Sequence, residues 1–334
     1  MRTQKAVIMN KIKFYFILSM LSLALFSCSK NKEEELTPPR EYSEQYATDI
    51  KDIEEYLKTY YIEEVTADFD IKISKIPTGG TQKSIWEQTT YPLQFREVNL
   101  HGLKYKLYYL VLNEGVGEYP SNVDAVFTAY KGDYLQQVTK DGVTTLTVTE
   151  FERSNNPQQF FQLTSVIRGW SEIFPKFKKG TYSSNPDGTV AYKDFGAGVV
   201  FIPSALAYYN GGSGSIPAYA PLVFNFKLYE IQRNDQDGDG IPSYLEDLDG
   251  DGYVYSFTNT TLYPTKPTTN PDDTDGDEVP DFLDVDDDGD NYTTKLERSY
   301  KDANGVVKYY DFADIPLCTG GNGKKRHLDP KCHD

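Results

Sequence analysis

The sequence predicts an α+β chain rich in β-strands, followed by an acidic and mostly irregular C-terminal region. Among its 334 residues are 27 Tyr and 18 Phe, and aromatic residues favour strands or an aromatic-lined pocket over a helical bundle. The net charge of −16 lies almost wholly within residues 235–297, which hold sixteen Asp and three Glu against two Lys. This distribution argues against nucleic-acid binding, which needs a basic face, and indicates one acidic segment that binds cations or stays disordered.

The N-terminus has the features of a secretory signal. Four basic residues precede an apolar run over residues 14–26, which is too short to span a bilayer stably. Cys28 follows directly and resembles the acylated cysteine of a bacterial lipoprotein; an ordinary signal with an incidental cysteine is the alternative. Ser29 in place of Asp favours the outer membrane of a Gram-negative cell, with the leaflet left open.

Two more cysteines, Cys318 and Cys332, lie near the C-terminus. An exported protein occupies a compartment in which disulfides form. The sequence therefore allows a disulfide between them, although the Gly-rich and basic residues 320–326 do not suggest a buried framework. A metal site of Cys332 with His327 and His333 is a weaker alternative.

The core elements can be predicted from periodicity. Residues 42–62 place apolar side chains three and four apart, which indicates a docking or spacer helix. Residues 69–76 alternate apolar and polar side chains before Pro77, and residues 103–112 form a second alternating segment. Both are predicted strands.

Residues 103–232 carry the motifs of a known family. A Gly-x-Gly-x-x-Pro turn at 115–120 leads into an aromatic strand at 124–132. Residues 161–170 end in Val-Ile-Arg-Gly-Trp, residues 202–208 read Ile-Pro-Ser-Ala-Leu-Ala-Tyr, and an apolar strand follows at 222–231. Their order resembles an FKBP-type peptidyl-prolyl cis-trans isomerase, whose fold is a twisted antiparallel β-sheet wrapped on a short helix.

The resemblance implies a pocket in which a proline ring sits on Trp170. The Ile167 backbone N–H and the Tyr208 hydroxyl would bind substrate carbonyls, and Glu152, where the family has Asp, would lie at the rim beside Tyr130. Rotation about the prolyl bond breaks no heavy-atom bond, so the reaction needs no nucleophile and no cofactor. The implied pocket residues are Tyr130, Phe151, Glu152, Phe161, Val166, Ile167, Trp170, Tyr208 and Phe224.

Three departures from the family support an alternative function. Tyr209 replaces the Gly that follows the pocket tyrosine, and a bulky residue disfavours a positive φ there. Residues 133–150 and 181–200 are longer than the family pattern and are expected to neighbour the pocket. The alternative is a catalytically weak or inactive peptide-binding or surface-interaction module.

The acidic segment contains loops of the calcium-binding type. Residues 235–246 fit the pattern D-x-D-x-D-G followed by five residues and Glu, which supplies hard oxygen ligands around a turn. Shorter or altered copies begin at Asp247, Asp273 and Asp286, and the close spacing resembles thrombospondin type-3-like calcium repeats. An acidic solvated linker is the other interpretation. The predicted calcium ligands are Asp235, Asp237, Asp239, Ile241, Glu246, Asp247, Asp249, Asp251, Asp273, Asp275, Asp277, Asp281, Asp284, Asp286, Asp288, Asp290 and Glu297.

Together these patterns predict a membrane-anchored prolyl isomerase that assists the folding of exported proteins, with structural calcium in its tail. Proline-containing polypeptides, the membrane and calcium are its expected partners. The predicted organisation is a signal peptide (1–27), a tether (28–41), an N-terminal helix and strands packed on the core (42–102), an FKBP-type domain (103–232), a calcium-repeat region (233–297) and a C-terminal tail (298–334).

Overall fold

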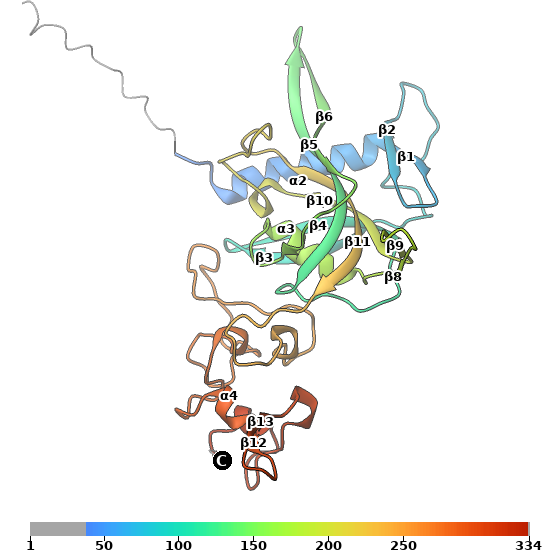
Figure 1. Cartoon of the computed structure of the whole chain (residues 1–334). Helices are drawn as coiled ribbons and strands as arrows, with labels where there is room; N and C mark the ends of the chain where they lie inside the picture. The colour runs from blue at the N-terminus through green and yellow to red at the C-terminus, as the bar shows by residue number, and fades with distance from the viewer. Residues whose placement is uncertain (1–37, 333–334) are drawn as a thin grey trace, which may run out of the picture. The chain divides into compact units, whose positions relative to one another are not determined.

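The computed structural model describes residues 38–332 (Figure 1). The predicted signal peptide and the predicted lipidation site, Cys28, lie outside the described residues. Residues from Arg40 onward form one compact unit. Within residues 38–332, no helix has both the length and the hydropathy that a membrane crossing requires.

A seven-stranded antiparallel sheet forms the core of the chain. Two of its hairpins turn through residue pairs with positive φ, His101–Gly102 and Asp141–Gly142, a geometry that matches the twist of paired strands. In spatial order the strands are β3 (Gln94–Leu100), β4 (Leu103–Asn113), β10 (Gly196–Ile202), β11 (Leu222–Gln232), β5 (Ala125–Lys140) and β6 (Val143–Ser154), with β7 (Phe161–Gln162) paired to β5.

Helix α2 (Tyr42–Thr59) covers one face of this sheet. Its apolar stripe buries Ile53 and Leu57 against residues of β4, β10 and β11, among them Phe201. The helix predicted from periodicity is confirmed, and it ends at Thr59 because the following residues enter a strand.

The opposite face is covered by helix α3 (Arg168–Ile173) and the 3-10 turn η1 (Phe174–Lys176). Strand β10 is buried along its whole length and serves both faces, because successive side chains point to opposite sides of a sheet. Phe201 packs with the α2 cluster, whereas Val200 and Ile202 pack with the α3 cluster. The result is a mixed α and β fold with a sheet at its centre.

Smaller elements surround this core. Strand β1 (Tyr60–Val65) pairs with β2 (Ile71–Lys75), and β8 (Thr181–Ser184) pairs with β9 (Val190–Lys193), so that each pair forms a two-stranded sheet. The 3-10 turn η2 (Ser204–Leu206) precedes Tyr208. The strand predicted over 69–76 is confirmed as β2, and the one predicted over 103–112 is confirmed as β4.

After strand β11 the chain has little regular structure. Cys318 and Cys332 form a disulfide, with Cα atoms 5.6 Å apart. The short elements of this region are η3 (Ser243–Leu245), η4 (Asp281–Leu283), α4 (Thr294–Glu297), β12 (Ser299–Lys301), β13 (Val307–Tyr309), η5 (Phe312–Asp314) and η6 (Arg326–Leu328).

Candidate active site and acidic loops

One pocket of about 480 Å³ gathers all nine residues that the family resemblance placed in a site. Ser165, Arg168 and Ala207 complete its wall. The lining side chains come from β5, β6, β7, α3 and β11 and from the loops before α3 and after η2. Segments that are distant in sequence therefore meet at one concave, mainly aromatic surface.

Trp170 lies at the floor because of how α3 begins. Ile167 precedes the helix with an extended backbone, φ −58° and ψ 143°, and its carbonyl accepts a hydrogen bond from the Trp170 amide at 2.9 Å. Gly169 allows α3 to approach β10, since a Cβ there would lie 2.6 Å from the Ile202 side chain. The indole is thereby turned inward and is only 6% exposed.

Aromatic rings in edge-to-face contact form the pocket walls. The ring centroids of Tyr130, Phe224 and Phe161 lie 5.1, 5.2 and 5.6 Å from that of Trp170. Phe151 lies 5.6 Å from Phe224. Such pairs contribute about 0.5–1.5 kcal/mol each beyond their burial, so the wall is held in place before any ligand arrives.

The pocket has a polar edge beside this wall. Burial, and after it the Glu152 carboxylate, raises the pKa of the Tyr130 hydroxyl, so this phenol stays protonated and can donate a hydrogen bond. Phe151 reaches the pocket across Gly132, where a Cβ would lie 2.4 Å from its ring. Tyr208 is 40% exposed, which leaves its hydroxyl accessible to a ligand.

Tyr209 adopts the left-handed backbone that a glycine would provide. Its φ is 46°, a conformation uncommon for a bulky residue. The Tyr209 ring stacks on Tyr42 with centroids 4.5 Å apart, and its hydroxyl donates a hydrogen bond to the Arg40 carbonyl. The expectation that a bulky side chain is incompatible with this turn is therefore wrong, because the start of α2 supports it.

A buried carboxylate holds the turn that precedes Tyr208. Asp49 of α2 is 0% exposed and accepts hydrogen bonds from the Ser204 amide at 2.7 Å and hydroxyl at 2.6 Å. Gln45 donates a third at 2.6 Å. Burial raises the pKa of Asp49 to about 6, although these bonds favour its charged form. Helix α2 thus positions the loop that carries Tyr208, beyond the docking or spacer role predicted for it.

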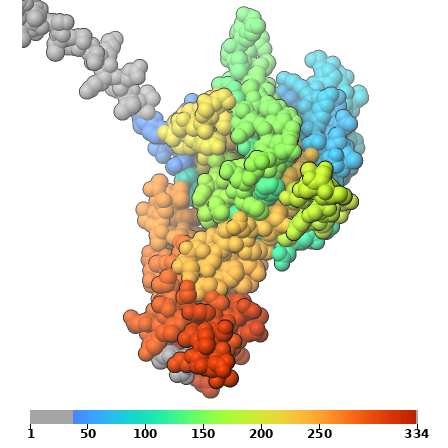
Figure 2. Space-filling model, in the orientation of Figure 1, coloured from blue at the N-terminus to red at the C-terminus, as the bar shows by residue number. Residues whose placement is uncertain are grey.

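The two longer segments do not reach the pocket. Residues 133–150 belong to the β5–β6 hairpin, whose tip projects from the sheet (Figure 2). Residues 181–200 contain β8, β9 and part of β10. Among the described residues that line the pocket, none comes from either segment, so the expectation that they neighbour the substrate is not met.

A charged joint connects α3 to the acidic region. Glu172 is 1% exposed and accepts hydrogen bonds from Arg96 at 2.8 Å, Arg168 at 2.7 Å and the Tyr255 hydroxyl at 3.0 Å. Arg168 lines the pocket and also a larger cavity of about 690 Å³ between β3 and residues 251–267. That larger cavity is lined by none of the nine predicted pocket residues, so the smaller pocket is the candidate site.

Four loops in the acidic region share one backbone geometry. The fourth residue of each is a glycine with positive φ, at 238, 250, 276 and 289. The sixth residue also has positive φ, including Glu278 at 83° and Asn291 at 75° where glycine is absent. Loops that begin at Asp273 and Asp286 therefore form the turn that the first loop forms with Gly240.

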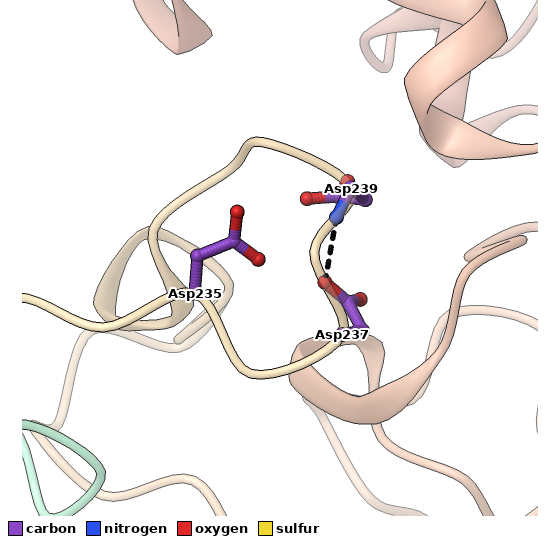
Figure 3. Close-up of side chains that lie close together, drawn as sticks. All are labelled: Asp235, Asp237 and Asp239. Carbon is purple, nitrogen blue, oxygen red and sulfur yellow. Dashed lines mark hydrogen bonds between the residues drawn. The ribbon is translucent and has the colours of Figure 1, made fainter.

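Carboxylates gather inside each of these loops. In the first loop Asp235, Asp237 and Asp239 bring ligand oxygens within 4.8 Å of one another (Figure 3), and the Asp239 amide donates to Asp237 at 3.1 Å. Equivalent triads occur in the other three loops. Both carboxylate oxygens of Glu246 and of Glu297 are buried without a hydrogen-bond partner in the described chain.

Two buried acidic residues near the loops were missed by the sequence pattern. Asp272 accepts a hydrogen bond from the Leu248 amide at 2.8 Å and faces the loop that begins at Asp247. Asp287 lies within 4.8 Å of Asp237 and Glu246. Neither occupies a ligand position of the repeat, so only the packing of one loop on another reveals them.

Comparison with known proteins finds relatives for part of the chain. The chain is similar to FKBP-type peptidyl-prolyl cis-trans isomerases. It is 29% identical over 188 residues to FkpA of Aeromonas hydrophila, covering 53% of this chain and 59% of that one. It is 32% identical over 131 residues to a probable FkpA of Neisseria meningitidis, covering 39% and 38%. The chain thus spans about half the length of the first of these relatives and less of the second.

Two solved structures and one family model add three further likenesses. A peptidyl-prolyl cis-trans isomerase from Pseudomonas syringae matches at 26% identity and a TM-score of 0.27, over 41% of this chain and 81% of that one. FkpA from Escherichia coli matches at 32% identity and a TM-score of 0.28, over 38% and 48%. Residues 236–325 match a family described as BamM C-terminal.

Proposed function

We propose that this protein is a peptidyl-prolyl cis-trans isomerase, anchored to the membrane through acylated Cys28, that assists the folding of exported proteins. The observation that carries the proposal is the single pocket formed by all nine family-pattern residues around Trp170. The similarity to FkpA proteins supports the same activity.

In the proposed mechanism the pocket binds the twisted prolyl amide better than the planar one. Rotation of that bond must pass a barrier of about 18–20 kcal/mol because amide resonance is lost. The proline ring sits on Trp170 between aromatic walls that exclude water, which favours the less polar, twisted amide. The Ile167 N–H and the Tyr208 hydroxyl bind the flanking carbonyls and fix the peptide while its prolyl bond turns.

We further propose the organisation and partners of the whole chain. A signal (1–27) and a tether (28–41) precede the helix and strands of 42–102 and the isomerase domain at 103–232, and an acidic region (233–297) and tail (298–334) follow. Proline-containing polypeptides are the substrates, the outer membrane is the location, and calcium is a structural ligand of the acidic loops. The buried, unpaired carboxylates of Glu246 and Glu297 support the calcium assignment.

A second candidate is a peptide-binding module with little or no isomerase activity. Glu152 favours this candidate, because the family pattern has the shorter Asp at the polar edge of the pocket. A longer side chain beside Tyr130 would alter how the edge meets the twisted amide without removing the apolar floor.

A peptide isomerisation assay separates the two candidates. The chain from residue 29 onward should accelerate cis-trans exchange of a short X-Pro peptide. Trp170→Leu should lower kcat/KM by at least about tenfold, equivalent to 1.4 kcal/mol of lost transition-state binding, and Tyr208→Phe should lower it less.

Matched controls exist in the same chain. Trp86, the other tryptophan, is 39% exposed and lies outside the pocket, so Trp86→Leu should leave kcat/KM unchanged. Binding of the peptide without acceleration, abolished by Trp170→Leu, would establish the second candidate. If the chain neither binds the peptide nor accelerates its isomerisation, both candidates are refuted.

A further inference from the structure

We infer that Asp287 is a calcium ligand of the first acidic loop, supplied by the fourth loop, so that one ion joins two segments about fifty residues apart in the chain. This inference rests on the proposed calcium-binding role of the acidic region. It adds a site residue that lies outside the repeat pattern, and it gives the acidic region a cross-link that its sparse apolar packing does not provide.

Asp287 does not occupy a ligand position of its own loop, the fourth. The repeat places ligands at the first, third and fifth residues, which in the fourth loop are Asp286, Asp288 and Asp290. Asp287 is the second residue, and its amide donates to the Thr294 hydroxyl at 3.2 Å. Its side chain therefore does not belong to the triad of its own loop.

The Asp287 carboxylate instead faces the first loop. Its ligand oxygens lie within 4.8 Å of those of Asp237 and Glu246. Asp237 also belongs to the triad with Asp235 and Asp239, so the two groups of carboxylates share a member. An ion held by the first loop would be within reach of Asp287.

Burial makes this group of carboxylates require a cation. Asp287 is 1% exposed and Glu246 is 3% exposed, and within residues 38–332 no group donates a hydrogen bond to any of their four carboxylate oxygens. An unpaired buried carboxylate costs several kcal/mol.

Two basic residues lie near these acids, but both bind backbone carbonyls. Lys295 donates to the Gly238 carbonyl at 3.2 Å, and Arg298 donates to the Asp239 carbonyl at 3.1 Å. Both come from the end of the fourth loop and hold it against the first loop independently of any ion. The position of Asp287 beside Glu246 is thus fixed by other contacts.

The ligand atoms at this site are all oxygens, and their number and type favour calcium. A hard divalent cation with six to eight oxygen ligands suits this set, since the first loop offers three aspartates, the Ile241 carbonyl and a bidentate Glu246. Asp287 adds one more oxygen, which calcium accommodates within its usual coordination number. Magnesium, which keeps a strict octahedron and several waters, fits less well.

The test compares Asp287→Asn with the unmodified chain from residue 29 onward, which includes the whole compact unit. Calcium binding is measured by titration calorimetry after chelation. One class of sites should lose at least tenfold in affinity in the variant. Asp314→Asn, which removes the same charge from an exposed position of the C-terminal tail, should bind as the unmodified chain does.

Thermal unfolding supplies a second readout, because the difference in Tm between the variant and the unmodified chain should change sign when calcium is added. In chelator the Asp287→Asn chain should have an equal or higher Tm, because a buried unpaired charge is gone, whereas in calcium its Tm should be lower. The double variant Glu246→Gln, Asp287→Asn should lose less binding free energy for calcium than the sum of the losses in the two single variants, because both residues bind the same ion.

Each outcome decides a separate question. If the unmodified chain binds calcium and Asp287→Asn binds it equally well, the cross-loop ligand is refuted while the calcium-binding role stands. If the unmodified chain binds no calcium, the calcium role itself fails and the inference falls with it.

Discussion

The pocket domain and the acidic region bury their residues in opposite ways. Around Trp170 the buried side chains are apolar, and the buried carboxylates there, such as Asp49 and Glu172, have hydrogen-bond donors. In the acidic region Glu246, Asp287 and Glu297 are equally buried, yet their oxygens lack donors in the described chain.

This difference shows what each region needs in order to fold. Apolar burial stabilises the pocket domain by about 25 cal/mol for each Å² removed from water, and that contribution requires no ligand. The acidic region has one small apolar cluster, Val123, Val254 and Phe282, and it packs Phe257, Leu262 and Tyr263 against the core of the pocket domain. Under the proposed calcium assignment, bound ions supply most of the remaining stability of its loops.

The largest expected effect is the loss of the acidic region alone when calcium is removed. At a hundred times Kd each bound ion contributes about 2.7 kcal/mol, and several sites are lost together. Limited proteolysis in chelator should cleave after Lys266, Lys295 and Arg298 while a fragment spanning residues 40–232 survives. Adding calcium should restore protection and magnesium should not. If the acidic region resists proteolysis equally in chelator and in calcium, it does not depend on ions more than the pocket domain does.

The pocket residues were predicted from the resemblance to a known family, whose motifs are each local in the sequence. Val-Ile-Arg-Gly-Trp encodes a helix start that turns one indole inward, and Gly169 and Gly132 leave room for neighbouring side chains. Periodicity likewise predicted α2 and strands β2 and β4. The left-handed Tyr209 could not be predicted, because its support comes from Tyr42 and Arg40, more than 160 residues earlier.

The acidic loops show the same limit. Their ligand spacing is local and follows from the repeat, as does the turn at each glycine. Asp272 and Asp287 have no such spacing, since each lies against a loop other than its own. The bond from Asp49 to Ser204 is similar, because it joins residues 155 positions apart. Contacts between segments of this kind depend on packing that one sequence does not display.

A second prediction concerns the apolar core of the pocket domain. Phe174 is 0% exposed, and its ring lies 5.3 Å from Trp170 and 4.8 Å from Phe226. Phe174→Ala should lower the free energy of unfolding by about 3–5 kcal/mol through lost burial and a cavity, measured by urea denaturation. The loss should be the same with and without calcium, and the exposed Tyr182→Ala should have little effect. A calcium-dependent loss would show that the two regions fold as one.

A third, smaller effect is expected at the joint between the regions. Glu172→Gln leaves Arg96 and Arg168 without their buried carboxylate and should cost about 3 kcal/mol. Because Tyr255 also bonds to Glu172, hydrogen exchange of the amides at 251–257 should accelerate as well. Glu97→Gln, at a half-exposed carboxylate nearby, is the matched control. Unchanged exchange at 251–257 would mean that the joint does not couple the two regions.

The smallest effect tests Asp49, a carboxylate of the core whose pKa is raised although three donors bind it. Burial raises the pKa of Asp49 to about 6 from an ordinary 3.8, so the folded state holds this proton more tightly than the unfolded state does. The contribution of Asp49 to stability is therefore greatest below about pH 4, and it falls as the pH rises to about 6. One pKa unit corresponds to about 1.4 kcal/mol, which sets the total fall at about 1–3 kcal/mol.

Asp49→Asn removes this titration and keeps one acceptor for Ser204. The free energy of unfolding of the unmodified chain minus that of the variant, measured in calcium, should decrease between pH 4 and 6 and then stay level. A difference that is constant over this range would mean that the Ser204 and Gln45 donors fully offset the burial of Asp49. The acidic loops would then differ from Asp49 in burying carboxylates, those of Glu246, Asp287 and Glu297, whose oxygens have no hydrogen-bond donor among the described residues.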